Sequence, residues 1–276
     1  MRSVNALVMT GYGINCHEET AAAYRMAGAQ AEIVHCHDLI TGRVSVHDFD
    51  LVTFPGGFSF GDDLGAGKAL ANKVRYRRLP GGSTLLDELQ RFLAAGKFVL
   101  GICNGFQVLV KSGLLPNVRG TCQQEATLTV NDSGVFEDRW VQCRALPHPG
   151  TPFLQGIDRI DLPVRHKEGK LIFRDDALRA RIVSEGLNCL SYCDAAGQPT
   201  LQYPHNPNGS VLACAALRDP TGHVLGLMPH PEAYLSALNH PDWGHRFRQD
   251  PGLSPEGEGL RLFQNIIAHC RSPEHT

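Results

Sequence analysis

The chain has 276 residues, of which 26 are Lys or Arg and 28 are Asp or Glu, so its formal net charge is −2 at pH 7. This balance provides no basic field that would recruit nucleic acid, and no segment has the length and apolarity of a membrane span. Nine scattered cysteines, an odd number, favour reduced thiols in a cytoplasmic protein. No linker rich in Pro, Ser and Gly divides the chain, so we expect one α/β domain over residues 1–276.

The first third of the chain alternates between apolar strands and amphipathic helices. Val4–Met9 is a predicted strand, a helical pattern runs from Glu18 to Ala27, and Ala31–Val34 begins a second strand. A strand, a helix and a strand in this order form the βαβ unit of a parallel sheet. Ligands bind at the carboxyl ends of such strands, so the loops there are candidates for a functional site.

The next predicted strand, Leu51–Phe54, leads directly into Pro55-Gly56-Gly57. Successive glycines after a strand leave backbone N–H groups with no side chain in front of them, and such a loop can hold an anion. If the loop lies beside a nucleophile, one of its N–H groups and that of Asn104 would form an oxyanion hole. An ordinary turn is the alternative interpretation.

Two helices are predicted between this loop and the following strand. The first runs from Gly65 through Val74, and the second reaches Ala95 from a predicted N-cap at Ser83. The strand that begins at Phe98 is then expected to complete the core of the sheet.

The stretch Phe98–Leu115 changes from an apolar strand to a helix at Cys103. Gly101 and Gly105 flank the cysteine, and the absence of their Cβ atoms relieves the crowding of a sharp turn. This pattern is the thiol counterpart of the G-x-S-x-G nucleophile elbow. Because a helix N-terminus favours a thiolate, Cys103 is the predicted nucleophile, with an inert buried cysteine as the alternative.

The second half is predicted to contain short antiparallel or edge strands joined by loops rich in Pro, Gly and Asp. These strands are Thr127–Val130, Trp140–Cys143, Leu162–Val164, Val211–Leu217 and Val224–Met228. A loop over residues 236–256 then leads to a final helix of about Gly257 to Cys270, whose apolar stripe is expected to pack on the sheet.

The tetrapeptide Pro229-His230-Pro231-Glu232 has a spacing that suits a partner of the nucleophile. Residues two apart in an extended segment face the same side, so His230 and Glu232 can face one cleft. A nucleophilic cysteine needs an imidazole, and the imidazole needs a carboxylate to fix its tautomer. The sequence therefore predicts a triad with Cys103. Cys189 and Cys193 lack a second pair of ligands at zinc-finger spacing, so no metal site is predicted.

Three motifs in this order resemble class I (triad) glutamine amidotransferases: Pro55-Gly56-Gly57, the elbow around Cys103, and the tetrapeptide with His230. A closer resemblance is to the family of glutaminase subunits of phosphoribosylformylglycinamidine synthase. It rests on GYGINCHEET, FPGGFSFGDDLGAGK, GICNGFQVLVKSGLLP, FEDRWV, LPVRHKEG, NPNGS and GLMPHPEAYL, between about Val4 and Tyr234.

The resemblance implies a single flavodoxin-like class I glutaminase domain, with a mostly parallel central sheet flanked by helices and extra antiparallel strands in the C-terminal half. Its core would span about residues 4–235, and the C-terminal loop and helix residues 236–270. Cys103 would be the nucleophile, His230 the general base and acid, and Glu232 the carboxylate that orients the histidine. The remaining implied site residues are Gly57 and Asn104 for the oxyanion hole, and Gly56, Phe58, Gln107 and His166 for glutamine binding.

Two positions depart from the family pattern. Lys167 stands where the family's His-Gly-Glu-Gly loop has its first glycine, which leaves the conformation of this loop and the role of Glu168 open. Ala233 stands where an arginine often follows His-Pro-Glu, a change that does not touch the triad.

The implied reaction is the hydrolysis of L-glutamine to glutamate and ammonia through a thioester. In this family the ammonia passes to a large ATP-dependent synthetase subunit that makes formylglycinamidine ribonucleotide, and short members also associate with a small bridging subunit. No G-x-x-x-x-G-K-[ST] sequence occurs, so ATP and Mg²⁺ are expected in the partner and no cofactor in this chain.

Two alternatives remain open from the sequence. One is another triad amidotransferase or a γ-glutamyl hydrolase on the same fold. The other is a non-catalytic redox or regulatory module, against which the presence of both His230 and Glu232 counts.

Overall fold

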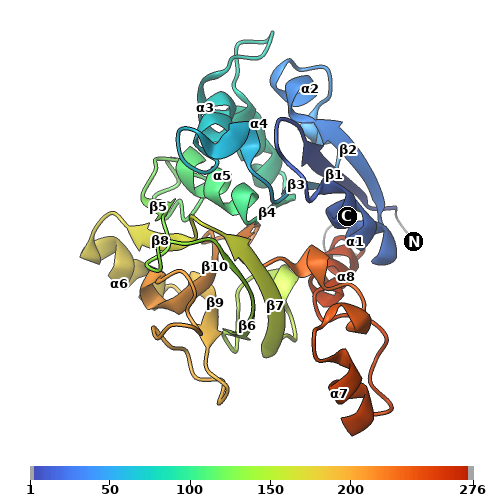
Figure 1. Ribbon diagram of the computed structural model, residues 1–276. Coiled ribbons are helices and arrows are strands. Elements are labelled where there is room, and N and C mark those ends of the chain that lie inside the picture. Colours follow the sequence, from blue (N-terminus) through green and yellow to red (C-terminus); the bar gives the residue numbers. More distant parts are fainter. Residues whose placement is uncertain (1–2, 273–276) are drawn as a thin grey trace.

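One large sheet runs through the centre of the structure, a computed structural model that describes residues 3–272 (Figure 1). Its strands are β1 (Asn5–Thr10), β2 (Gln30–His35), β3 (Leu51–Phe54), β4 (Phe98–Ile102), β6 (Glu137–Ala145), β7 (Arg159–His166), β9 (Asn188–Cys193), β10 (Cys214–Arg218) and β11 (Val224–Leu227). A second, two-stranded sheet pairs β5 (Ala126–Thr129) with β8 (Lys170–Phe173).

The order of strands in the large sheet is β2-β1-β3-β4-β11-β10-β9-β6-β7. Neighbouring strands from β2 to β11 are parallel, and those from β11 to β7 are antiparallel. The parallel part follows the 2-1-3-4-5 order of flavodoxin-like folds when β11 is counted as the fifth strand. The predicted α/β class, with extra antiparallel strands in the C-terminal half, is therefore confirmed.

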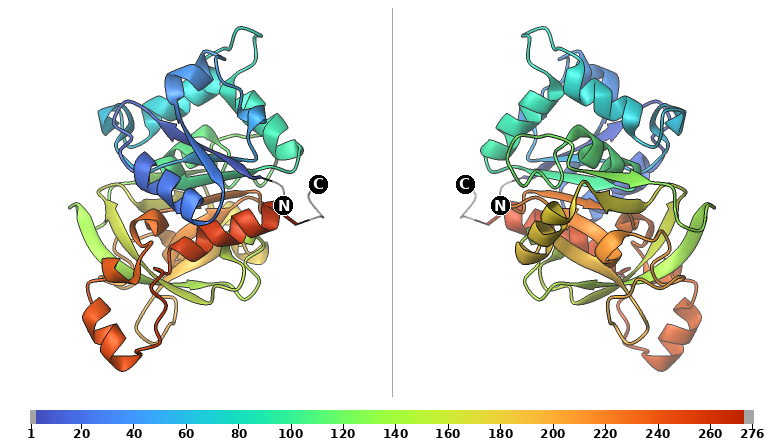
Figure 2. Two further views of the ribbon diagram at one scale, coloured as in Figure 1. Left: turned by 90° about the vertical axis from the view of Figure 1, so that its right-hand side faces the viewer. Right: turned by 90° about the vertical axis from the view of Figure 1, so that its left-hand side faces the viewer.

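Most of the helices flank this sheet, whereas α7 projects away from it (Figures 1 and 2). They are α1 (His17–Met26), α2 (Cys36–Ile40), α3 (Lys68–Tyr76), α4 (Leu85–Ala94), α5 (Asn104–Ser112), α6 (Asp176–Ser184), α7 (Trp243–Gln249) and α8 (Leu260–Cys270). The C-terminal α8 packs beside the N-terminal α1, where the rings of Tyr24 and Phe263 meet edge to face at 5.0 Å between centroids. Across residues 3–272, no helix combines the length and the apolar character that crossing a bilayer requires.

The strand sequences explain the two kinds of pairing. In β3, β4 and β11 every residue is buried, as expected for parallel strands covered on both faces. In β6, by contrast, buried residues are interspersed with partly exposed ones, as in a strand with one face toward solvent.

The prediction that the sheet core ends with β4 is wrong, because β11 adds a further parallel strand beside it. Leu225 pairs with Leu100, and Leu227 with Ile102. The apolar run of β11 resembles an edge strand in length, but it is buried on both sides. This pairing joins segments more than a hundred residues apart and places their carboxyl ends next to each other.

The predicted strand Val211–Leu217 is wrong in its first part. Residues Val211–Ala213 form a 3-10 turn in which Leu212 has a φ of 60°, and the strand begins only at Cys214. No element predicted from the sequence corresponds to α2, β8, α6, β9 or α7.

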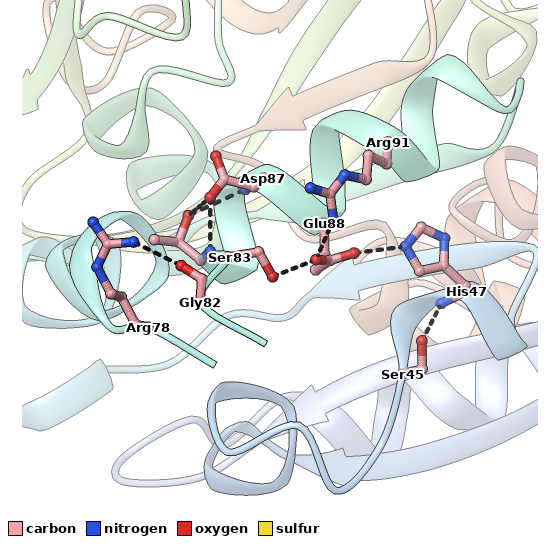
Figure 3. A network of polar contacts seen from close by, with 9 residues as sticks. Ser45, His47, Arg78, Gly82, Ser83, Asp87, Glu88 and Arg91 are labelled. Carbon is pink, nitrogen blue, oxygen red and sulfur yellow. Dashed lines mark hydrogen bonds and ion pairs between the residues drawn. The ribbon is translucent and has the colours of Figure 1, made fainter. Parts of the chain in front are cut away.

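The N-terminus of α4 is capped by Thr84 and not by the predicted Ser83. Thr84 Oγ1 accepts a hydrogen bond from the Asp87 N–H at 3.2 Å, and Asp87 Oδ2 accepts one from the Thr84 N–H at 2.7 Å. These reciprocal bonds form a capping box. Ser83 instead donates its hydroxyl to Glu88 at 2.6 Å, and Glu88 also contacts His47 and Arg91 (Figure 3).

Candidate active site

Cys103 stands in a sharp turn between β4 and α5. Its φ of 49° and ψ of −103° lie in a region that residues with a side chain rarely adopt. A Cβ on Gly105 would lie 1.8 Å from the Phe54 carbonyl oxygen, and one on Gly101 would lie 2.5 Å from Leu109. The two glycines thus let α5 pack closely against the sheet, which holds the thiol at the carboxyl end of β4.

His230 lies just beyond β11 and therefore beside the end of β4. Its N–H donates to the Pro163 carbonyl at 2.8 Å, which ties this segment to β7. Nδ1 of His230 is 2.6 Å from Oε1 of Glu232, and both residues are buried. Cys103 and His230 line the same cavity at this end of the sheet. The structure thus brings the three residues of the predicted triad together.

The thiol and the imidazole are not hydrogen-bonded to each other in this structure: the Cys103 thiol donates to the Arg165 carbonyl at 3.6 Å, and His230 Nε2 has no hydrogen-bond partner among the described residues. Catalytic hydrogen bonds are often poorly aligned without substrate and tighten in the substrate complex.

The electrostatics of the pair favour a charged imidazole. Burial alone would lower the pKa of His230, but the carboxylate of Glu232 and the adjacent Cys103 raise this pKa well above its usual range. The imidazolium form can pair with a thiolate and can later donate a proton to a leaving group.

The loop after β3 places Gly57 over the end of the sheet. Gly57 forms a β-bridge with Ile14 in which the hydrogen bonds run between flanking residues, from Asn15 to Gly56 at 3.2 Å and from Phe58 to Gly13 at 2.8 Å. The N–H of Gly57 itself lies outside this bridge. Its φ of 144° and the 2.6 Å that would separate a Cβ from the Gly13 oxygen require a glycine here.

Two adjoining cavities open at Cys103, one of about 360 Å³ and one of about 250 Å³. The larger is lined by Gly57, Phe58, Asp62, Ala66, Cys103, Gln107, Val130, Phe136, Arg165, His166, Lys167 and Glu168. The smaller is lined by Asn15, Cys16, Glu19, Gly57, Phe58, Cys103, Phe136, Arg165 and His230. Larger cavities elsewhere contain none of the predicted site residues.

The residues predicted to bind glutamine fall in different places. Phe58, Gln107 and His166 line the larger cavity. Gly56 lies against His230 instead, since a Cβ there would be 2.7 Å from the imidazole Cε1.

His166 is a buried, neutral imidazole. Burial lowers its pKa to about 3, and the nearby His230 adds to this effect. Asn131 Oδ1 accepts from the Gly169 N–H at 2.9 Å and lies 3.2 Å from His166 Nδ1, so Nδ1 carries the proton. Nε2 of His166 is then an acceptor, and no described residue bonds to it.

Asn104 and Gln107 form a hydrogen-bonded pair at the start of α5. Asn104 Nδ2 donates to Gln107 Oε1 at 2.9 Å, and Asn104 Oδ1 accepts from the Ser59 N–H at 3.2 Å. Gln107 Nε2 donates to the Glu168 carbonyl. The amide of Gln107 thus joins the elbow helix to the loop after β7.

A buried lysine, Lys111, supports the same loop from α5. Its Nζ donates to the Ala66 carbonyl at 2.6 Å and lies 3.7 Å from Glu168 Oε2, which accepts from the Ala66 N–H at 3.0 Å. Burial lowers the pKa of Lys111 and raises that of Asp62 nearby. Lys167 itself is exposed, and its carbonyl accepts from the Asn131 N–H at 2.9 Å.

Sequence reasoning assigned no role to Cys16, Lys111 or Asn131. Cys16 lies in a glycine-containing turn after the first strand, which is a signal for a ligand-binding loop. Lys111 interrupts an otherwise apolar helix, which is a signal for a buried charge. Asn131 lies in a loop, and nothing in the local sequence marks it.

A set of possible metal ligands lies beside the smaller cavity, which Cys16 and His230 line. One ligand atom each from Cys16, His230 and Glu232 lie within 4.8 Å of one another.

Comparison with known proteins gives consistent matches. Residues 3–270 match the family described as the CobB/CobQ-like glutamine amidotransferase domain. The chain is 39% identical over 271 residues to phosphoribosylformylglycinamidine synthase subunit PurQ of Dehalococcoides mccartyi, covering 98% of this chain and 99% of that protein. The subunit of the same name from Methanococcus maripaludis is 40% identical over 271 residues, covering 95% and 96%.

Among solved structures, the structure of PurLQS from Thermotoga maritima contains a similar chain. The two superpose with a TM-score of 0.70 at 26% identity, over 98% of this chain and 100% of that one.

Proposed function

The chain belongs to the CobB/CobQ-like glutamine amidotransferase family, and we propose that Cys103, His230 and Glu232 are its catalytic residues. It is the glutamine-hydrolysing subunit of phosphoribosylformylglycinamidine synthase, which acts in purine biosynthesis. The observation that carries the catalytic assignment is the meeting of the elbow after β4 with the buried His230–Glu232 pair after β11.

In the first step, the thiolate of Cys103 attacks the side-chain carbonyl carbon of glutamine and forms a tetrahedral intermediate. The N–H groups of Gly57 and Asn104 stabilise its oxyanion. When the C–N bond breaks, the imidazolium of His230 donates a proton to the departing ammonia, which leaves a thioester on Cys103.

In the second step, neutral His230 takes a proton from water, and the resulting hydroxide attacks the thioester. Collapse of the second intermediate releases glutamate and restores the thiolate and imidazolium. Glu232 stays ionised and holds Nδ1 of the ring throughout, so that Nε2 faces the reacting atoms.

Glutamine itself binds in the larger cavity. A neutral His166 offers Nε2 as an acceptor for a substrate N–H, and Phe58 covers the apolar part of the substrate. Gln107 positions the loop after β7 through its bond to the Glu168 carbonyl.

The ammonia passes to a large ATP-dependent synthetase subunit, with a small bridging subunit in the complex. The match to a chain of an assembly named PurLQS supports this arrangement. ATP and Mg²⁺ belong to the synthetase, and this chain uses no cofactor of its own. We also propose that residues 1–276 form one domain, which the continuous central sheet supports, and that the protein is cytoplasmic, which its nine cysteines favour.

The experiment that tests this function mixes the chain with the synthetase subunit, formylglycinamide ribonucleotide, ATP and Mg²⁺. With glutamine, product should require this chain, and Cys103→Ala should abolish it. With an ammonium salt, product should form equally well with the wild type, with Cys103→Ala or without the chain. Product that forms from glutamine in the presence of Cys103→Ala would refute the catalytic assignment.

A further inference from the structure

Two carboxylates, those of Asp62 and Glu168, line the larger cavity. One belongs to the loop after β3 and the other to the loop after β7, and glutamine hydrolysis as described above gives neither of them a task. Glutamine carries an α-ammonium group in addition to the carboxamide that reacts. Because a cation that leaves water needs a partner of opposite charge, a carboxylate in this cavity suits that group.

The carboxylate of Glu168 is already paired within the protein. Its Oε2 accepts from the Ala66 N–H at 3.0 Å and lies 3.7 Å from Nζ of the buried Lys111. Nζ of Lys111 in turn donates to the Ala66 carbonyl at 2.6 Å. These contacts balance the charge of Glu168 and tie the loop after β7 to the loop after β3. Glu168 is therefore a link between two loops and not a site for a cation.

The carboxylate of Asp62 is held by neutral donors only. Its Oδ1 accepts from the Gly67 N–H at 3.1 Å and from Asn104 Nδ2 at 3.2 Å. No described residue forms an ion pair with Asp62, and this includes Arg165 and Lys167, the cations that line the cavity. Burial accordingly raises the pKa of this carboxyl group. Of the two carboxylates, Asp62 is thus the one whose charge the protein leaves unbalanced.

Asp62 lies within reach of a glutamine bound at the nucleophile. Asn104, whose side chain donates to Asp62, directly follows Cys103 in the chain. In extended glutamine the carboxamide carbon and the α-nitrogen are separated by four bonds, or about 5 Å. Asp62 also has a φ of 54°, and such left-handed backbone in a residue with a side chain gathers at ligand sites.

We propose that Asp62 binds the α-ammonium group of glutamine and thereby selects an amino acid over primary amides that lack this group. Both described hydrogen bonds of the carboxylate go to Oδ1, so Oδ2 is available to accept from the ammonium. Lys111 sharpens the selection, because by pairing with Glu168 it leaves Asp62 as the single unbalanced carboxylate of the cavity. This assignment rests on the proposed function, which makes glutamine the substrate.

The test compares glutamine with 4-carbamoylbutanoate, which is glutamine without its α-ammonium group. The full chain is assayed with the synthetase subunit, and release of glutamate or glutarate is measured. Asp62→Asn removes the charge but keeps an oxygen that accepts from Gly67 and Asn104, and asparagine tolerates the positive φ. We expect kcat/KM for glutamine to fall about ten- to hundredfold, mainly through KM, because a hydrogen bond between charged groups is lost. For 4-carbamoylbutanoate it should stay within about threefold.

Asp63→Asn is the matched control, since Asp63 is an exposed carboxylate of the same loop that does not line the cavity. It should leave both values of kcat/KM unchanged. An equal loss of kcat/KM for the two compounds in Asp62→Asn would show a structural role, and a wild-type KM for glutamine would show no role in binding. Either result would overturn the proposal.

A second measurement needs no variant. L-Glutamate and glutarate differ only by the α-ammonium group, and as competitive inhibitors of the wild type they should differ about tenfold or more, with glutamate the stronger. Equal inhibition by the two would overturn the ammonium site.

The outcomes separate this site from the proposed function. A chain that releases no glutamate from glutamine would refute the proposed function, and the ammonium site would fall with it. Glutamine hydrolysis that requires Cys103, with Asp62→Asn as selective as the wild type, would refute the ammonium site alone.

Discussion

The two halves of the central sheet contribute to the site in different ways. The parallel half ends in the reacting groups, with Cys103 after β4 and His230 after β11, and their placement follows from strand register and a strained turn. The antiparallel half supplies a wall through the end of β7, where the side chain of Asn131, in the loop between β5 and β6, holds His166 and Gly169 by hydrogen bonds. We infer that the rate of the chemical step depends on the first half, and glutamine affinity on the second together with Asp62.

The largest effect is expected in the parallel half, from Glu232→Gln. Loss of the carboxylate should lower kcat for glutamine hydrolysis by roughly 10²–10⁴-fold, since the imidazole loses its orientation and its charge partner. Removal of this negative charge also lowers the pKa of His230, which Glu232 raises in the wild type. The alkaline limb of the pH–kcat profile, which reports loss of the imidazolium proton, should therefore move to lower pH. Steady-state kinetics across pH measures both.

Glu18→Gln, an exposed glutamate of α1, is the control for Glu232→Gln. It should leave the profile in place. If the alkaline limb of the pH–kcat profile of Glu232→Gln lay at the same pH as in the wild type, Glu232 would not be the charge partner of His230.

For the wall at the end of β7, which Asn131 holds from the loop between β5 and β6, Asn131→Ala should mainly raise KM. The buried N–H of Gly169 and carbonyl of His166 lose their partner, which should cost about 1–3 kcal/mol of unfolding free energy. Urea unfolding and steady-state kinetics provide the two readouts. A fall in kcat as large as that of Glu232→Gln, with KM unchanged, would break the division between the two halves.

A smaller effect, on stability alone, is expected from Asp87→Ala at the start of α4. The variant loses the capping box and should be about 1 kcal/mol less stable at neutral pH, with glutamine hydrolysis unchanged. The backbone N–H of Thr84 lowers the pKa of Asp87 below its usual 3.8. The stability difference should therefore persist above pH 3.8 and disappear as the pH falls through the lowered value.

Urea unfolding at several pH values measures this difference. A difference in unfolding free energy between Asp87→Ala and the wild type that grows as the pH falls would contradict the predicted direction of the pH dependence. A large loss of glutamine hydrolysis in Asp87→Ala would show that a residue of the parallel half that lies outside the site still affects the rate.

The smallest effect is expected from Lys167→Gly, which restores the family's glycine in the loop after β7. The Lys167 side chain is exposed, and its loop is held through main-chain atoms that the change does not remove. We expect kcat/KM within about threefold of the wild type, as for other exposed substitutions. A tenfold change would show that the side chain contacts glutamine.

The sequence predicts those parts of the site that depend on local geometry. Paired glycines around Cys103 mark the turn. The pairing of His230 with Glu232 was expected from an extended segment, but Pro231–Ala233 form a 3-10 turn, and it is this turn that brings the two side chains together. The order of strands in the sheet is not set by the local sequence. Whether β11 lies beside β4 depends on which apolar strand fits between the two layers of helices. Asn131 acts through long-range bonds, so no neighbouring residue marks it. At α4, Ser83 and Thr84 are chemically equivalent caps, and only the position of Asp87 decides between them.

The most direct test of the account is covalent labelling with an electrophilic analogue of glutamine that traps the nucleophile. We predict one label per chain, found on Cys103 by peptide mass spectrometry, prevented by excess glutamine and accompanied by complete loss of glutamine hydrolysis. A label on Cys16, or full hydrolysis by a chain whose Cys103 is labelled, would contradict it.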